Sequence, residues 1–155
     1  MNRRRKSLLY RELFAKIARM HEEVAYRKHL NHYNEGGGSC KDYPNVSIGA
    51  ELNGFTAVGH HHYYSRVQDF HKMIYRKLTL RLGDLNKFSR HYPLCKNKVG
   101  HCAENYAASG VLRQYDPRNS VHDGRILYRI NFTKAIQPRT YKTIEMCANC
   151  HTMYG

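Results

Sequence analysis

Two cysteine-containing segments, GHCAENYAAS and TIEMCANCHT, constrain the fold of this 155-residue chain more than any other feature. The first carries Cys102 and, two residues later, Glu104, and the second carries Cys147 and Cys150 with Cys-x-x-Cys spacing. At a strand-to-helix junction, Cys-x-x-Cys points both sulfurs at one ion, and nearby backbone amides favour the thiolates. If the three thiols share a metal ion, the fold must bring together segments that lie 45 residues apart in the sequence.

This donor set predicts a metal site with catalytic character. Thiolates from Cys102, Cys147 and Cys150 leave one tetrahedral position open for water on a zinc ion, which is typical of catalytic zinc. Glu104 is two residues from the first ligand, so its carboxylate lies close to that water without binding the metal, where it can move protons.

Two other interpretations of the cysteines stay open. In the first, the zinc site is structural and closed, with Cys95, His101 or His151 as the fourth ligand. The spacing from Cys95 to Cys102 is loose for a zinc ribbon, and this interpretation leaves Glu104 without a role. In the second, the cysteines are buried thiols without metal, and Glu104 is an acid that the helix dipole favours in a first turn.

The two segments resemble the zinc-dependent deaminases of the cytidine deaminase-like fold, whose signature is His/Cys-x-Glu followed by Pro-Cys-x-x-Cys. This superfamily includes nucleoside and nucleic-acid deaminases and bacterial toxin-type deaminases. The stretch IGAELNGFTAVGHHH is similar to its first two strands, and YKTIEMC resembles the strand that runs into its Cys-x-x-Cys helix. The resemblance covers residues 46–62 and 100–151, with Met146 where the family usually has Pro.

The resemblance implies hydrolytic deamination of a nucleobase, with cytosine favoured because the first ligand is Cys. Cys102, Cys147 and Cys150 would bind Zn²⁺. Glu104 would carry a proton from the zinc-bound water to the ring nitrogen and then to the leaving ammonia. The substrate of this hydrolase would be single-stranded nucleic acid or a nucleotide, since a base inside a duplex is out of reach of a buried zinc.

The resemblance also implies substrate contacts. The backbone N–H of Ala103 would contact the base, and the carbonyl of Glu145 or Met146 would face the leaving amine. His60 or His61 would take the position of the family's polar residue after the second strand.

The sequence predicts an α/β chain in three parts. Residues 1–35 contain an amphipathic helix, because apolar side chains recur at helical spacing from residue 5 to 33. The glycine-rich stretch 36–45 is a flexible joint. Residues 46–155 form the deaminase-like domain, with a basic insertion at 63–99.

Within this domain, Asn53-Gly54 is the strongest local signal, because both central residues of a type I′ turn need positive φ. Around it, the sequence predicts strands at 46–52 and 55–61, helices at 66–82 and from Glu104 to about residue 113, and strands at 125–136 and 140–145. We expect a three-layer-like, cytidine deaminase-type fold with a mixed sheet built on the hairpin and the 140–145 strand beside it. The C-terminal strands of the family are expected to be missing or replaced, because five residues follow Cys150.

The charge predicts a polyanionic partner. The chain has 26 Lys and Arg against 12 Asp and Glu, a net charge of +14, and such a field favours nucleic acid. Five cations on the predicted 66–82 helix would form a positive rim beside the pocket: Arg66, Lys72, Arg76, Lys77 and Arg81. As an alternative, they are the solvated face of a covering helix.

A second function class stays open, a zinc-stabilised nucleic-acid-binding module without catalysis. The five cysteines are an odd number, and no apolar run suits a signal peptide or a membrane span. We therefore expect an intracellular, cytoplasmic setting, or delivery into a target cell if the chain is a toxin, and no membrane partner. The sequence leaves the oligomeric state open.

Overall fold

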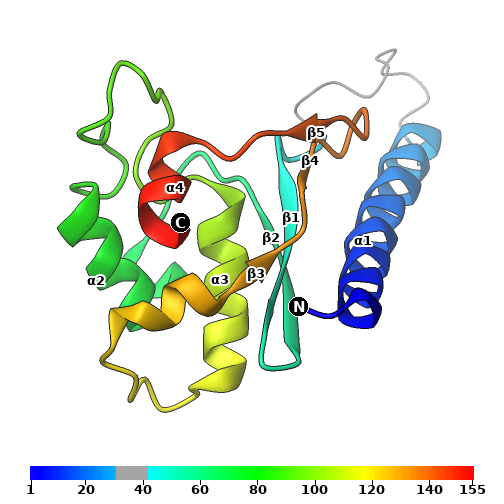
Figure 1. Ribbon diagram of the computed structural model, residues 1–155. Helices are drawn as coiled ribbons and strands as arrows, with labels where there is room; N and C mark the ends of the chain where they lie inside the picture. Colours follow the sequence, from blue (N-terminus) through cyan, green and yellow to red (C-terminus); the bar gives the residue numbers. More distant parts are fainter. Residues whose placement is uncertain (31–41) are drawn as a thin grey trace.

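The hairpin around Asn53-Gly54 lies at the centre of the computed structural model, which describes residues 1–30 and 42–155 (Figure 1). Strand β1 (Ser47–Leu52) pairs with β2 (Phe55–His60) in antiparallel register along their whole length. Asn53 and Gly54 have φ angles of 50° and 90°, as a type I′ turn requires. The predicted hairpin is confirmed. The last residues predicted for the N-terminal helix, most of the predicted glycine-rich joint, and Cys40 lie outside the described residues.

The sheet continues on the other side of β1, in the order β2-β1-β4-β5, with β3 also paired to β1. These short strands are β3 (Asn131–Phe132), β4 (Ala135–Ile136) and β5 (Thr143–Ile144). All pairings among the described strands are antiparallel, so the predicted mixed sheet is wrong. The strand predicted at 140–145 is reduced to β5, and β4 separates it from the hairpin.

The strand predicted at 125–136 breaks into three pieces. Its first half is a 3₁₀ helix (Gly124–Arg129) in which the consecutive residues Ile126 and Leu127 are both buried, which a strand with alternating faces cannot achieve. Between β3 and β4 the register against β1 shifts by one residue, which indicates a β-bulge at Thr133-Lys134. The bulge is held by Thr133, whose backbone N–H donates to the Gly49 carbonyl at 2.9 Å.

Helices cover both faces of the sheet (Figure 1). Helix α1 (Arg3–Leu30) packs on one face, where Leu13 and Ile17 contact Val58 and Ile136. Helix α3 (Ala103–Tyr115) packs on the other face, with α2 (Lys72–Arg81) and α4 (Ala148–Tyr154) beside it. No helix in the described parts of the chain is both long and apolar enough to cross a membrane.

The basic helix predicted at 66–82 begins later than its apolar periodicity suggested. Val67–Asp69 form a separate 3₁₀ turn, and α2 starts after His71, which is its N-cap. The His71 ring is fully buried: its Nδ1 accepts a hydrogen bond from a backbone amide of the first turn, and its Nε2 lies 3.0 Å from Asp116. This buried cap, which periodicity does not reveal, sets the start of the helix.

Glycine allows α3 to lie directly against β2. A Cβ at Gly59 would stand 2.3 Å from the carbonyl oxygen of Ala103 and 2.3 Å from the backbone nitrogen of Ala107. Further along, a Cβ at Gly110 would stand 2.6 Å from the Cβ of Ala57. Gly59 therefore determines the height of the first turn of α3 above the sheet, and Gly110 that of a later turn.

We expect Gly59→Ala to lower the free energy of unfolding by at least about 3 kcal/mol, because the new methyl group would push the helix backbone off the strand. Gly49→Ala is the matched control on β1. There the new Cβ would meet side-chain atoms, such as Leu9 Cδ1 at 3.0 Å, which can yield. Urea unfolding measures both values, and equal losses in the two variants would contradict the close approach at Gly59.

Candidate metal centre

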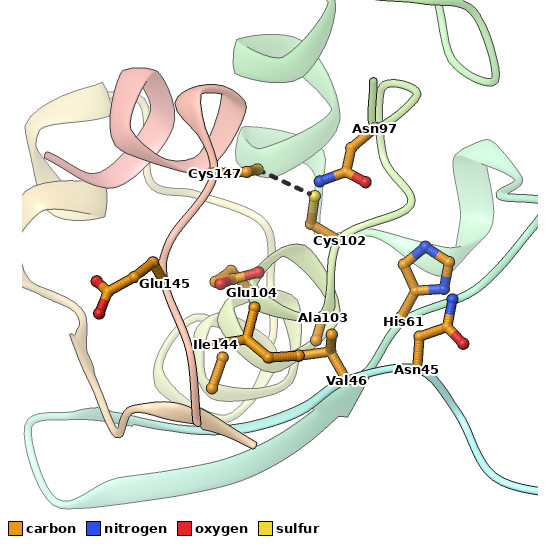
Figure 2. A pocket seen from close by; sticks show the side chains of 11 residues that line it. Asn45, Val46, His61, Asn97, Cys102, Ala103, Glu104, Ile144, Glu145 and Cys147 are labelled. Carbon is orange, nitrogen blue, oxygen red and sulfur yellow. Dashed lines mark hydrogen bonds between the residues drawn. The ribbon is translucent and has the colours of Figure 1, made fainter. Parts of the chain in front are cut away.

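Three cysteine thiols meet where α3 and α4 begin, and Figure 2 shows two of them, Cys102 and Cys147. Cys102 is the N-cap of α3, Cys147 is the N-cap of α4, and Cys150 lies in the first turn of α4. The Sγ atoms of Cys102 and Cys147 are 3.5 Å apart, and all three Sγ atoms lie within 4.8 Å of one another. The predicted convergence is confirmed, and the three cysteines could hold a metal ion.

Contacts along the two helices bring their starts together. The buried Tyr154 hydroxyl of α4 donates a hydrogen bond to Asn105 Oδ1 of α3, at 2.8 Å. At the same C-terminal end of α4, Arg81 Nη1 donates to the Met153 carbonyl at 3.1 Å, which joins α2 to the same assembly. The metal-ligand atoms are thus positioned by helices that pack into one core.

The donor geometry fits a zinc ion. Bonds of about 2.3 Å to sulfur give S–S edges of about 3.8 Å in a tetrahedron. The Cys102–Cys147 distance of 3.5 Å is close to this value, and all three sulfurs lie within 4.8 Å of one another. Thiolates prefer Zn²⁺ to Mg²⁺ or Ca²⁺. Within the described residues, no fourth His, Cys, Asp or Glu ligand atom lies within 4.8 Å of all three sulfurs. A closed site completed by Cys95, His101 or His151 is therefore not formed.

The three thiols differ in pKa, because each has different hydrogen-bond partners and burial. Hydrogen bonds from the Cys102 and Cys150 thiols, and one from the Asn97 side chain, hold the pKa of Cys147 far below its ordinary value. Hydrogen bonding to Cys147 raises the pKa of Cys102, and hydrogen bonding together with burial raises that of Cys150. A metal ion must therefore displace protons from two thiols, so that its affinity falls at low pH.

Glu104 lies against the thiols but outside the ligand group. Its carboxylate is 5% exposed, and its Oε2 accepts a hydrogen bond from the Cys150 thiol at 3.3 Å. Burial is the main cause that raises the pKa of Glu104 above its ordinary value. A raised pKa makes the Glu104 carboxylate a better proton acceptor than an ordinary exposed carboxylate.

A cavity of about 180 Å³ opens over Cys102, Cys147 and Glu104 (Figure 2). Two of the predicted substrate contacts, Ala103 and His61, line its wall. Glu145, a third predicted contact, also lines the cavity, and Figure 2 shows its carboxylate turned away from the cysteines.

The other two predicted contacts do not line this cavity. His60 faces α1, and its Nδ1 forms a hydrogen bond of 2.7 Å with the Ser47 hydroxyl. Met146 packs against the hydrophobic core. Successive residues of a strand point to opposite faces, so only one of the neighbouring residues His60 and His61 can reach the cavity.

Two polar residues that line this cavity, Asn45 and Asn97, were not predicted from the sequence. The Asn97 side chain helps to lower the pKa of Cys147, and the Asn97 carbonyl accepts a hydrogen bond from Asn149 Nδ2 at 2.9 Å. Asn149 lies inside the Cys-x-x-Cys motif, so this hydrogen bond ties Asn97 to the segment that carries Cys147 and Cys150. Because Asn97 lies in an irregular stretch without periodicity, no pattern in the sequence marked it as facing inward.

None of the five cations predicted to form a positive rim lines this cavity within the described chain. Arg81 binds the end of α4, Arg66 pairs with Asp69 at 3.8 Å, and Lys77 lies over Gly124. Lys72 and Arg76 line a separate cavity of about 420 Å³.

Comparison with known proteins identifies no relative. No family model, curated protein or solved structure matches this chain. Its function therefore has to follow from the chemistry of its site.

We expect Cys147→Ser to lower the metal content of the purified protein from about one ion per chain to near zero, because a Ser hydroxyl is a poor replacement for thiolate. Cys95→Ala is the matched control, since Cys95 is a buried thiol outside the ligand group. Inductively coupled plasma mass spectrometry measures both. Metal loss in Cys95→Ala alone would place the ion elsewhere.

We expect His60 to make stability depend on pH. Burial, with Lys16 and His62 nearby, lowers the pKa of His60 from 6.5 to about 4. The unfolded chain therefore binds more protons between these values, so the stability from this group is lost as the pH falls from 6.5 towards 4.

The matched variant is His60→Asn, whose amide oxygen can still accept from Ser47. Over this range the wild type should lose about 2 kcal/mol more than the variant, a value discounted for partial exposure. Chemical unfolding at several pH values measures the difference, and parallel curves would contradict the assignment.

Proposed function

We propose that this protein is a zinc-dependent hydrolytic deaminase of the cytidine deaminase-like fold. It acts on a nucleobase, with cytosine favoured, in single-stranded nucleic acid or a nucleotide. One observation carries the proposal: the three sulfurs lie within 4.8 Å of one another, and the Glu104 carboxylate lies 3.3 Å from one of them. The choice of deamination as the reaction rests on the resemblance of the two cysteine segments to the deaminase signature.

The open side of the ligand group supports catalysis. Cys102 and Cys147 line the cavity, whereas Cys150 is fully buried behind them. The fourth tetrahedral position therefore has room on the cavity side for water and substrate. A zinc ion held by these three thiolates would act as a Lewis acid and lower the pKa of a bound water.

Glu104 is the proton carrier of the proposed reaction. Water adds to the amine-bearing ring carbon, the C–N bond breaks, and the products are a ring carbonyl and ammonia. Glu104 takes one proton from the water and gives it to the ring nitrogen, then takes the proton of the added hydroxyl group and gives it to the departing amine as the carbonyl forms. Its raised pKa suits both directions of transfer.

His61 and the size of the cavity favour a single nucleobase, and not a larger ligand, as the group that enters the cavity. Among the described residues, His61 Nδ1 is a buried nitrogen without a hydrogen-bond partner, a costly state that a polar ligand would relieve. Burial lowers the pKa of His61, so its ring is neutral and can donate or accept. The volume of about 180 Å³ is below the roughly 300–1,000 Å³ of pockets that hold whole drug-sized ligands.

The test is release of ammonia and uracil from cytidine, its monophosphate, and single-stranded DNA and RNA by the zinc-loaded protein. Glu104→Ala should lower the rate at least about 100-fold while zinc stays bound. Glu22→Gln, an exposed acid of α1, is the control and should keep the rate.

Two results would overturn this proposal. If Glu104→Ala loses zinc together with activity, the carboxylate supports the metal site and is not shown to be a proton carrier. If the zinc-loaded protein binds nucleic acid but releases no ammonia from any of these substrates, it is a zinc-stabilised binding module.

A further inference from the structure

A second cavity, of about 340 Å³, continues from the metal-site cavity. The two share the walls formed by Asn45, His61 and Asn97, which lie together on one side of the site in Figure 2. We call the second cavity the flanking groove. Its own walls are Tyr63, Phe88, Lys96, Lys98 and His101.

The flanking groove is positively charged. Lys96 and Lys98 are both exposed, and neither forms an ion pair with a described residue. The Lys98 ammonium lies 5.4 Å from the centre of the Phe88 ring, which holds it at the groove wall. Between Asp84 and Glu104 the chain contains four Lys or Arg and no acidic residue. Such a surface attracts phosphate.

Tyr63 offers a stacking surface at the same place. Its side chain is 73% exposed, so burial in the core does not explain its position. The ring meets His61 edge-on, with centroids 5.0 Å apart and an angle of 79° between planes. Because most of the side chain is exposed, a nucleobase can lie against the Tyr63 ring.

Hydrogen bonds fix the backbone of the segment that forms the wall of the flanking groove. Backbone bonds join Asn86 N–H to the Val99 carbonyl at 3.1 Å, and Val99 N–H to the Lys87 carbonyl at 2.9 Å. Asn149 of α4 donates to the Asn97 carbonyl at 2.9 Å. The segment that carries both lysines is therefore fastened to the helix that carries the metal ligands, which lowers the entropic cost of binding.

From this geometry we infer that the flanking groove binds the nucleotide next to the target base, and that the substrate is single-stranded nucleic acid rather than a free nucleotide. Lys96 and Lys98 bind the phosphate, and the neighbouring base stacks on Tyr63. This inference rests on the proposed function for what occupies the metal-site cavity. Helix α2 is a separate basic surface, and its cations are absent from the described walls of both cavities.

The first test is binding of fluorescein-labelled single-stranded DNA and RNA, measured by fluorescence anisotropy over a range of salt concentrations. Lys96→Glu/Lys98→Glu should weaken binding about ten-fold or more. It should also lower the slope of log Kd against log salt by about 1.4, since each single-strand phosphate contact contributes about 0.7. The DNA and RNA arms identify the preferred sugar.

The control is Lys72→Glu/Arg76→Glu on α2, which makes the same change in net charge away from the groove. It should change the affinity by less than about three-fold. Equal weakening by the two pairs would show a general charge effect and overturn the inference, as would weakening by the α2 pair alone.

Stacking is tested by Tyr63→Ala against Tyr64→Ala. Tyr64 is 68% exposed but does not line the groove. Tyr63→Ala should weaken oligonucleotide binding about ten-fold, and Tyr64→Ala should leave it nearly unchanged. Equal effects would remove Tyr63 from the binding surface.

Turnover separates this inference from the proposed function. In Lys96→Glu/Lys98→Glu, the ratio of kcat/KM for an oligonucleotide to kcat/KM for the free nucleotide should fall about ten-fold. If the variant is active and the ratio is unchanged, the flanking groove does not bind the neighbouring nucleotide, but the proposed deaminase activity is supported. Groove-dependent binding without deamination of any substrate overturns the deaminase and leaves the groove as a nucleic-acid site.

Discussion

The contact between β2 and the first turn of α3 at Gly59 is the constraint on which the site depends. Without a Cβ at this position, the helix backbone lies directly on the strand. Cys102 and Glu104 at the start of α3 are thereby held near His61, which follows directly after β2. The Tyr154–Asn105 hydrogen bond then aligns α4 with α3, and the second pair of thiols arrives at the same place. A rigid backbone contact thus determines the geometry of the ligands.

A metal ion at the three cysteines would also connect folding with chemistry. Without a cation, a thiolate at Cys147 and a buried carboxyl at Glu104 lie in one poorly solvated cluster, where two like charges are costly. A divalent cation reverses this cost, because it favours the thiolates of all three cysteines. Binding to the folded chain then stabilises the fold by mass action. The residues proposed for catalysis are therefore also those that gain most from the metal.

The predicted basic insertion at 63–99 has two parts with different surroundings. Helix α2 packs beside α3 and α4, and Arg81 binds the end of α4. The irregular part that follows borders the metal-site cavity and contributes Asn97 to its wall. Its hydrogen bonds to Asn149 make its position depend on the Cys-x-x-Cys helix. A single basic stretch of sequence thus provides a structural layer and a surface beside the site.

The sequence by itself determined the features that depend on a few neighbouring residues. Asn53-Gly54 specifies the hairpin turn through positive φ, and Cys-x-Glu and Cys-x-x-Cys mark the two helix starts and the ligand set. Tertiary structure alone decided the order and the antiparallel pairing of the strands. It also decided that residues 124–129, with Ile126 and Leu127 buried, form a 3₁₀ helix and not a strand, and that the cations on α2 point away from the cavity. It also brought Asn97 to the thiols. The physical reason is the sequence separation over which each interaction acts. Turn and capping preferences act within a few residues, whereas strand pairing, burial and side-chain direction depend on partners far away in the chain.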